Sequence, residues 1–228
     1  MAGSVILSGA RTPIGKLSGA LASLSATDLG GIAIKGALER AGIAGTDVDY
    51  VVMGQVILAG SGQMPSRQAA HKGGIPLSVP STTINKACLS GLNAIHLADQ
   101  MIQAGEADIV VAGGMESMTG SPYLLLNGRT GYRYGDGTLH DALLHDGLTC
   151  AFECVAMGES TERFAASAQI PREPQDEFAA RSHERAARAQ KDGLFDEEIT
   201  PVTIPQRKGD PIVVSADEGI RVGTTPET

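Results

Sequence analysis

Short apolar runs alternate with segments of helical period over the first 119 residues, and this alternation narrows the choice of fold sharply. The order is typical of βαβ units, in which helices connect parallel strands. We predict strands at residues 5–7, 50–53, 82–84 and 109–112. The last is a continuous apolar run, as expected of a strand that is buried on both faces. The predicted fold class is therefore α/β, with a largely parallel sheet.

Three helices are predicted between these strands. Thr27 is the predicted cap of a helix that stops at Gly42, and Pro65 precedes a short helical run. A third helix is expected from about Ser90 to Gly105. The residues expected on its apolar face are Leu92, Ile95, Ala98, Met101 and Ile102. These helices supply the crossovers that a parallel sheet requires.

The pattern changes near residue 120. Residues 120–148 hold six glycines and few long apolar runs, which indicates an irregular excursion. Helices are predicted at 157–169 and 174–191, and Pro174 and Gly193 mark the boundaries of the second. The apolar positions of that second helix are Phe178, Ala179, Ala186 and Ala189. Short strands are predicted at 199–205 and 212–214.

Composition argues against several classes of protein. The net charge is −8, from 18 basic and 26 acidic side chains, so a nucleic-acid partner is not expected. No stretch is long and apolar enough to span a bilayer, and the first residues do not resemble a signal peptide. Three cysteines without regular spacing fit a reducing compartment rather than a disulfide framework. We therefore expect a soluble, cytoplasmic protein without a membrane partner.

Cys88 lies where a predicted strand gives way to a helix. Unpaired N–H groups and the helix dipole favour an anion at a helix N-terminus, and the thiolate is the reactive form of cysteine. Gly91 allows a sharp turn and leaves room for an acyl group. The position is comparable to the nucleophile elbow of hydrolases. Cys88 is thus a candidate nucleophile, and a buried structural cysteine is the alternative.

The other cysteines, Cys150 and Cys154, are four residues apart. A pair of metal ligands is one interpretation, but no third ligand is evident and a structural role is simpler. The five histidines form no ligand pattern. We therefore predict no metal site.

Several motifs resemble those of one family. Asn-Lys-Ala-Cys-Leu-Ser-Gly at 85–91 resembles the acyl-cysteine signature of thiolases. Gly-Ala-Arg-Thr-Pro-Ile-Gly-Lys at 9–16 is similar to their opening "G-A-R-T-P-x-G", and Gly-Gly-Met-Glu-Ser-Met at 113–118 to their "G-G-x-E-S-M". Further similarities lie at 54–56, 67–70, 146–148, 157–158, 175–182 and 201–202. Together these motifs are specific and cover nearly the whole chain in order, so the chain resembles the thiolase family, acetoacetyl-CoA type.

The resemblance implies a thiolase-like βαβα core half with an inserted loop domain. By that mapping, residues 1–119 are the N-terminal core and 120–228 most of the loop and oligomerisation domain, and both are incomplete. The family repeats its core in a second half, which carries a His in "G-H-P" and a Cys in "C-x-G-G". Neither motif occurs in this sequence. We therefore expect that the C-terminal half is absent here, that the natural chain continues, and that these 228 residues alone are inactive.

The resemblance also implies an activity and its site. The family condenses two acetyl-CoA molecules to acetoacetyl-CoA and CoA, or runs the reverse thiolysis, and Cys88 would carry the acetyl group. Leu148 and Met157 map to the walls of the pantetheine tunnel, and Arg221 maps near the nucleotide of CoA. Core packing is the alternative for Met157, and a surface charge is the alternative for Arg221. The implied partners are acetyl-CoA, acetoacetyl-CoA and CoA as substrates and products, with no other cofactor, and a homotetramer is expected.

The sequence departs from the family pattern in places that concern the acyl chain. Ala156 stands where short-chain relatives often carry His, and Gly219 and Val222 replace the residues usual around the mapped arginine. Phe152 and the pair Met157-Gly158 nevertheless favour the short-chain type. A longer-chain 3-ketoacyl-CoA thiolase, a non-catalytic CoA-binding chain and a cysteine hydrolase therefore stay open as alternatives.

Overall fold

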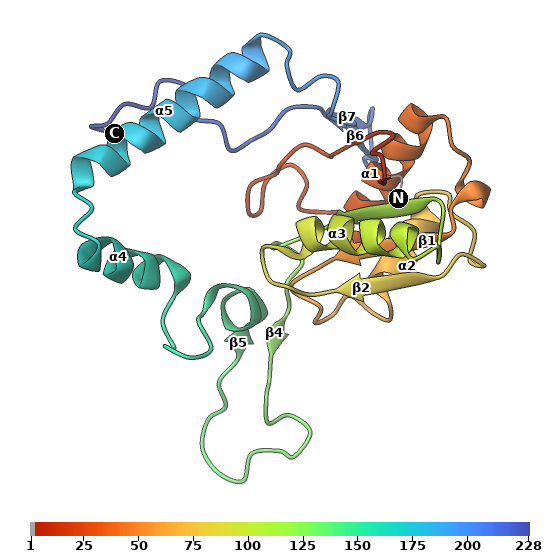
Figure 1. Cartoon of the computed structure of the whole chain (residues 1–228). Coiled ribbons are helices and arrows are strands. Elements are labelled where there is room, and N and C mark those ends of the chain that lie inside the picture. Colours follow the sequence, from red (N-terminus) through yellow and green to blue (C-terminus); the bar gives the residue numbers. More distant parts are fainter. Residues whose placement is uncertain (1–2) are drawn as a thin grey trace.

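A computed structural model describes residues 3–228, and a small parallel sheet lies at its centre (Figure 1). The strands β1 (Tyr50–Gly54), β2 (Ser81–Ile84) and β3 (Val110–Gly114) are arranged in the order β2-β1-β3. Both pairings are parallel, so the carboxyl ends of all three strands meet at one edge. The α/β class and three of the four predicted strands of this region are confirmed.

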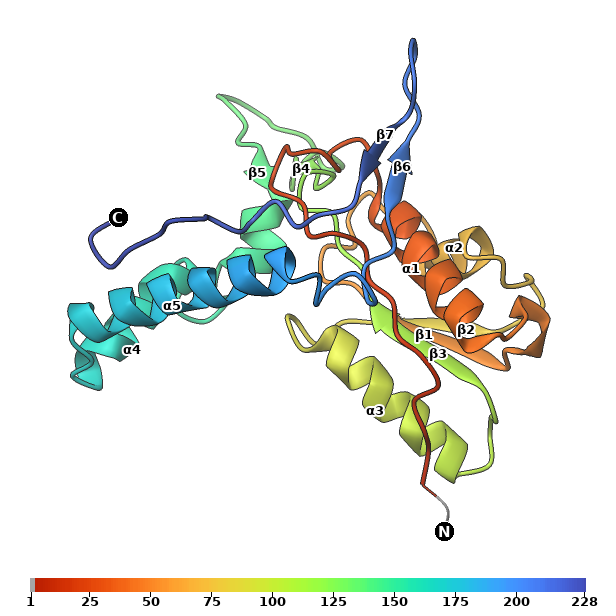
Figure 2. The same cartoon turned by 90° about the horizontal axis from the view of Figure 1, so that it is seen from above.

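Helices cover both faces of this sheet. Helices α1 (Ala26–Ala41) and α2 (Pro65–Lys72) lie on one face, and α3 (Ser90–Gln103) lies on the other (Figure 2). The main core lies between β1 and the first two helices. Its most buried members include Ile34, Val51, Met53, Ala69 and Ile75.

The start of α1 differs from the prediction. Ser25, not Thr27, is the N-cap: its hydroxyl accepts from the N–H of Asp28, whose carboxylate accepts from the N–H of Ser25. Thr27 is instead buried inside the first turn, where Lys72 Nζ donates to its hydroxyl at 2.7 Å. Gly42 ends the helix at a φ of 66°, as predicted from its place after the last apolar position.

The strand predicted at 5–7 is wrong. Among residues 3–228 no strand pairs with this segment, and the side chains of Val5, Ile6 and Leu7 are 62–82% exposed. The segment is extended and is held at both ends by serine hydroxyls: Ser4 Oγ donates to Asp99 Oδ1 at 2.7 Å and Ser8 Oγ to the carbonyl of Ala37 at 2.6 Å. An apolar β-branched run favours a strand, but it needs a partner to become one.

The expected two-sided burial is found in β1 rather than in β3. Val51, Val52 and Met53 of the central strand are at most 2% exposed. The first four residues of β3 are half-buried and Gly114 is exposed, because this strand lies at an edge of the sheet. The apolar run at 109–112 therefore indicated a strand correctly but not its place in the sheet.

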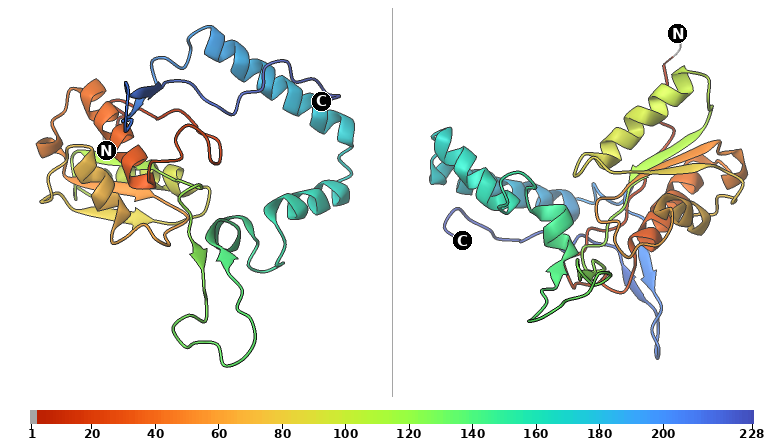
Figure 3. Two further views of the ribbon diagram at one scale, coloured as in Figure 1. Left: turned by 180° about the vertical axis from the view of Figure 1, so that it is seen from behind. Right: turned by 90° about the horizontal axis from the view of Figure 1, so that it is seen from below.

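After residue 120 the chain leaves the sheet and forms an arm (Figures 1 and 3). The arm begins with the short antiparallel pair β4 (Tyr123–Leu124) and β5 (His140–Asp141) and the π-helix η2 (Leu143–Leu148). The longer helices α4 (Met157–Ser167) and α5 (Arg172–Lys191) follow. The predicted helices are confirmed, but Phe178 of α5 is 65% exposed and packs on Arg181 rather than facing a core.

The chain then returns to the first helix. The hairpin of β6 (Val202–Ile204) and β7 (Ile212–Val214) packs beside α1, where Val202 and Ile204 form a small core with Leu21. A short 3-10 helix η1 (Gly45–Asp47) completes the described elements. The predicted division at residues 119 and 120 stays a prediction. None of the helices in residues 3–228 is long and apolar enough to cross a membrane.

Candidate active site

Cys88 lies at the carboxyl edge of the sheet, in the connection from β2 to α3. β2 ends at Ile84 and α3 begins at Ser90, so Cys88 is two residues ahead of the helix. Its side chain is exposed, which excludes the alternative of a buried structural cysteine. The crevice outside the carboxyl ends of parallel strands is where open α/β sheets bind ligands.

The turn before Cys88 is held by hydrogen bonds from two side chains. The buried Ser90 accepts from the N–H of Lys86 at 2.8 Å and donates to the carbonyl of Ala87 at 2.6 Å. Asn85 Oδ1 accepts from the N–H of Ala87 at 3.0 Å, and Asn85 Nδ2 donates to the carbonyl of Val56 at 3.0 Å. These bonds tie the turn both to the start of α3 and to the loop after β1.

Three glycines let the start of α3 approach the strand ends closely. A Cβ on Gly54, the last residue of β1, would lie 2.5 Å from the Cβ of Ser90. Gly91 and Gly114 face each other across the helix and β3, and a Cβ on Gly114 would lie 3.3 Å from the Cα of Gly91. Side chains at these positions would push the helix, and the turn that carries Cys88, away from the sheet.

Glu116 joins the end of β3 to the loop after β1. Its Oε2 accepts from the N–H of Val56 at 2.8 Å and from that of Ile57 at 3.3 Å, while Oε1 is buried without a partner in the described chain. Burial raises the pKa of this carboxyl, although the N–H donors of Val56, Ile57 and Ser117 oppose the shift. Glu116 is thus a half-buried acid close to the strand ends.

The opening motif forms a loop that is anchored by carboxylates from the other end of the chain. Arg11 makes a bidentate pair with Asp217, at 2.8 and 3.0 Å, and its Nε donates to Glu198 at 2.8 Å. Glu218 accepts from the backbone N–H groups of Lys16 and Ala20. The sequence did not indicate this anchoring role of the motif residues, because their partners lie about 200 positions away.

Leu148 and Met157 stand at the two ends of one hairpin. Thr149 and Ala156 form an isolated antiparallel bridge, and just outside it Leu148 ends η2 and Met157 begins α4. Leu148 is half-buried against the cluster that includes Ile57, whereas Met157 is 51% exposed at the start of α4. The core-packing alternative for Met157 is therefore not supported.

Arg221 lies in the segment after β7. It is exposed, and its backbone N–H donates to Nδ1 of His183 on α5 at 3.3 Å. This bond holds the segment against the arm and leaves the guanidinium in solvent. The structure thus places Leu148 and Met157 on either side of one backbone bridge, while Arg221 lies along α5.

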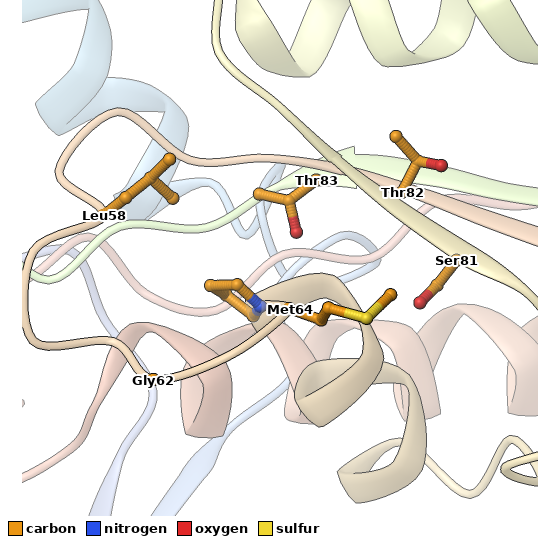
Figure 4. A pocket seen from close by; sticks show the side chains of 7 residues that line it. Leu58, Gly62, Met64, Ser81, Thr82 and Thr83 are labelled. Atoms are coloured by element: carbon orange, nitrogen blue, oxygen red, sulfur yellow. The ribbon is translucent and has the colours of Figure 1, made fainter.

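Cys88 does not line the hollow that Figure 4 shows. This hollow measures about 420 Å³ and lies between the loop after β1, the start of α2 and β2. Met64 and the β2 residues Ser81, Thr82 and Thr83 line it. The candidate nucleophile is instead on an open surface.

Cys150 and Cys154 occupy the tight turn of the hairpin that follows η2. The N–H of Cys154 donates to the carbonyl of Cys150 at 2.9 Å, and both thiols are free. Within residues 3–228 the structure contains no group of three or more His, Cys, Asp or Glu side chains that could hold a metal ion.

Comparison with known proteins identifies the family. The family model described as "Thiolase, N-terminal domain" matches residues 4–228. The chain belongs to the thiolase family. It is 57% identical over 225 residues to a probable acetyl-CoA acetyltransferase of Mycobacterium tuberculosis, covering 99% of this chain and 57% of that protein. It is 52% identical over 221 residues to the acetyl-CoA acetyltransferase of Cupriavidus necator, covering 97% and 56%.

One solved structure has the same fold. The acetyl-CoA acetyltransferase from Syntrophomonas wolfei superposes with a TM-score of 0.93 at 41% identity, covering 98% of this chain and 56% of that one. The fold class read from the sequence motifs is thereby confirmed. This thiolase-family chain spans a little over half the length of the relatives it matches.

Proposed function

We propose that the polypeptide carrying this sequence is a thiolase-type acyltransferase that condenses two acetyl-CoA molecules to acetoacetyl-CoA through an acetyl group on Cys88. One observation supports this most: an exposed cysteine in the acyl-cysteine motif, presented by a hydrogen-bonded turn where β2 leads into α3. The names of the similar proteins from Mycobacterium tuberculosis and Cupriavidus necator point to the same reaction.

The first half-reaction transfers the acetyl group to the protein. The thiolate of Cys88 attacks the carbonyl carbon of acetyl-CoA, and the bond from that carbon to the sulfur of CoA breaks. Coenzyme A leaves as a thiolate and takes up a proton. Negative charge that develops on the carbonyl oxygen needs N–H donors, and the backbone N–H of Cys88 is one candidate.

The second half-reaction forms the carbon–carbon bond. A second acetyl-CoA loses a proton from its methyl group, and the resulting carbanion attacks the acetyl-cysteine. The carbon–sulfur bond to Cys88 breaks and acetoacetyl-CoA is released. The family's proton-transfer residues belong to the "G-H-P" and "C-x-G-G" motifs, which do not occur in residues 1–228, so this step is proposed for the whole natural polypeptide.

Coenzyme A is proposed to lie along the arm. Leu148 and Met157, which flank the bridged hairpin, would contact the pantetheine chain. The exposed guanidinium of Arg221 would contact the nucleotide end, where phosphates attract a cation. The glycine-rich connection between β4 and β5, with the exposed Tyr132 and Tyr134, is the proposed contact of a homotetramer.

A 3-ketoacyl-CoA thiolase for longer chains is the second candidate. Ala156, the N-cap of α4, supports it, because this small side chain next to Met157 leaves space where a larger residue would restrict the acyl chain. The two substrates can be compared directly in the thiolysis direction.

The test is a kinetic comparison of ketoacyl-CoA substrates of four and eight carbons, with the natural polypeptide. We expect thiolysis with ping-pong kinetics, a higher kcat/KM for acetoacetyl-CoA, and discharge of the acyl group by CoA rather than by water. Faster turnover of the eight-carbon substrate would select the second candidate. Release of the acyl group by water alone would indicate a hydrolase, and binding of CoA without any turnover would indicate a non-catalytic chain.

A further inference from the structure

The residue before the nucleophile has an unusual backbone conformation. Ala87 has a φ of 48°, in the left-handed region that residues with a side chain rarely occupy. Alanine is not stabilised there by its own side chain, so neighbouring groups must hold the conformation. Because Ala87 directly precedes Cys88, its φ and ψ set the direction in which the nucleophile leaves the turn.

The hydroxyl of Ser90 is the group best placed to hold it. Ser90 Oγ accepts from the N–H of Lys86 at 2.8 Å and donates to the carbonyl of Ala87 at 2.6 Å, so it spans the backbone on both sides of the bend. Ser90 is only 4% exposed and packs against Gly54 at the end of β1. Its position is therefore fixed by the sheet.

Ordinary capping of the helix does not account for this hydroxyl. Ser90 is the first residue of α3, and the N-cap is Leu89, whose side chain makes no capping bond. The hydroxyl bonds back to Lys86 and Ala87 instead of to the free N–H groups of the helix. Its two bonds thus serve the turn that carries Cys88.

We propose that Ser90 is a positioning residue for the acyl transfer: through its two bonds it keeps Ala87 left-handed and so keeps the thiol of Cys88 directed outward. The inference rests on the proposed function, because it assigns a partner to the same nucleophile. Ser90 itself touches no substrate in this account; it acts through Ala87.

The test compares Ser90→Ala with Ser66→Ala in the natural polypeptide. Ser66 is a matched control: it is fully buried, its hydroxyl accepts from the hydroxyl of Thr83 at 2.9 Å, and it lies on α2. For Ser90→Ala we expect acetylation of Cys88 by acetyl-CoA to slow by about tenfold to a hundredfold, as misplacement of a reacting group does. The dissociation constant of CoA should stay at the wild-type value, and Ser66→Ala should acetylate at the wild-type rate.

A second variant asks whether Ser90 acts through Ala87. Glycine adopts a positive φ without strain, so Ala87→Gly in the Ser90→Ala background should recover part of the lost rate. If Ser90→Ala does not fold, Ala87→Val strains the same turn from its exposed side, since a β-branched residue strongly disfavours this φ. Ala87→Val should then acetylate slowly while CoA binding is unchanged.

Each result decides the proposal. Ser90→Ala acetylating as fast as Ser66→Ala, a double variant no faster than Ser90→Ala, or Ala87→Val at the wild-type rate would each overturn it. If the wild-type protein is not acetylated at all, the proposed function fails. Alkylation of Cys88 by iodoacetamide then tests the positioning alone: slower alkylation of Ser90→Ala supports it, and equal rates refute it.

Discussion

Some residues of the candidate site would react with substrate, and others hold the reacting residues in position. Cys88 is exposed on its turn. Ser90 and Glu116 instead accept hydrogen bonds from backbone N–H groups close to the strand ends. This division predicts different consequences when each side chain is removed.

The exposure of Cys88 predicts that its removal leaves the fold intact. Cys88→Ala should change the free energy of unfolding by no more than about 0.5 kcal/mol, as substitutions outside the core do. Urea denaturation of the variant and the wild type measures the difference. A decrease of several kcal/mol in the free energy of unfolding would indicate that Cys88 is a structural cysteine instead.

Glu116 predicts a dependence of stability on pH. Burial raises its pKa in the folded state above the ordinary value of 4.5, so the folded protein favours the protonated acid. Its contribution to stability is fully present below 4.5 and is lost as the pH rises through the raised folded value. Relative to Glu116→Gln, the wild type should therefore lose stability as the pH rises above 4.5. Urea unfolding of both proteins at a series of pH values measures this difference. An opposite slope would show that the N–H donors of Val56 and Ile57 outweigh burial.

Among the elements, the contact of α3 with the strand ends is the one that locates the nucleophile. The motif glycines have a packing role here, since Gly54 meets Ser90 and Gly114 meets Gly91 with no space for side chains. A substitution at one of these glycines should therefore move α3 and the turn that carries Cys88 together, away from the strand ends.

Gly54→Ala should disturb both stability and acyl transfer. The new Cβ would lie 2.5 Å from the Cβ of Ser90, and relieving that contact costs about 1–3 kcal/mol, the range for overpacked sites. Acetylation of Cys88 should slow because Ser90 moves with the helix. Gly158→Ala is the matched control: its Cβ meets nothing within 4 Å near the start of α4, so stability should hold or rise. Thermal unfolding and acetylation rates of both variants test this, and equal behaviour would contradict the packing role.

Sequence periodicity predicted most elements but not their partners. Gly42 and Gly193 marked helix ends correctly, because a chain leaving a helix often needs a positive φ. The apolar run at 5–7 predicts a strand that does not form, because strand formation depends on a neighbour that local sequence does not reveal. On α3, the small Ala94 and Ala98 are buried while Leu92 is 65% exposed, because the close approach at Gly54 and Gly114 favours small residues against the sheet.

The candidate site was predicted in part. The strand-to-helix position of Cys88 followed from local patterns, and its exposure agrees with that prediction. The supporting bonds of Ser90, Asn85 and Glu116 could not be predicted, since they join backbone groups brought together only by the sheet. The roles of Leu148, Met157 and Arg221 came from family resemblance and stay predictions.

At the scale of the whole molecule, contacts between residues far apart in sequence join the opening loop to the last part of the chain. Arg11 and Asp217 are 206 positions apart, and their bidentate pair ties the opening loop to the segment that follows β7. The side chain of Asp217 is 8% exposed, so the pair is shielded from solvent more than a surface ion pair. The same segment leads to Arg221, which links this tether to the proposed CoA contact.

Asp217→Asn should loosen that tether. Removing the charge should cost about 1.5–3 kcal/mol at neutral pH, the range for hydrogen bonds to charged groups. Burial opposes ionisation of Asp217, but the bonds from Arg11 and the N–H of Ile14 outweigh it and lower the pKa below 3.8. The wild-type advantage should thus be present above 3.8 and disappear as the pH falls through the lowered value. Asp176→Asn, which breaks an exposed pair with Arg172 on α5, is the control and should change unfolding in urea little.

The most direct measurement is mass spectrometry of the natural polypeptide after exposure to acetyl-CoA. We expect one acetyl adduct, on the peptide that contains Cys88. The adduct should be absent from Cys88→Ala and should disappear from the wild type when CoA is added. Peptides with Cys150 and Cys154 serve as internal controls and should stay unmodified. An unmodified Cys88, or an acetyl group found on another cysteine instead, would contradict the account.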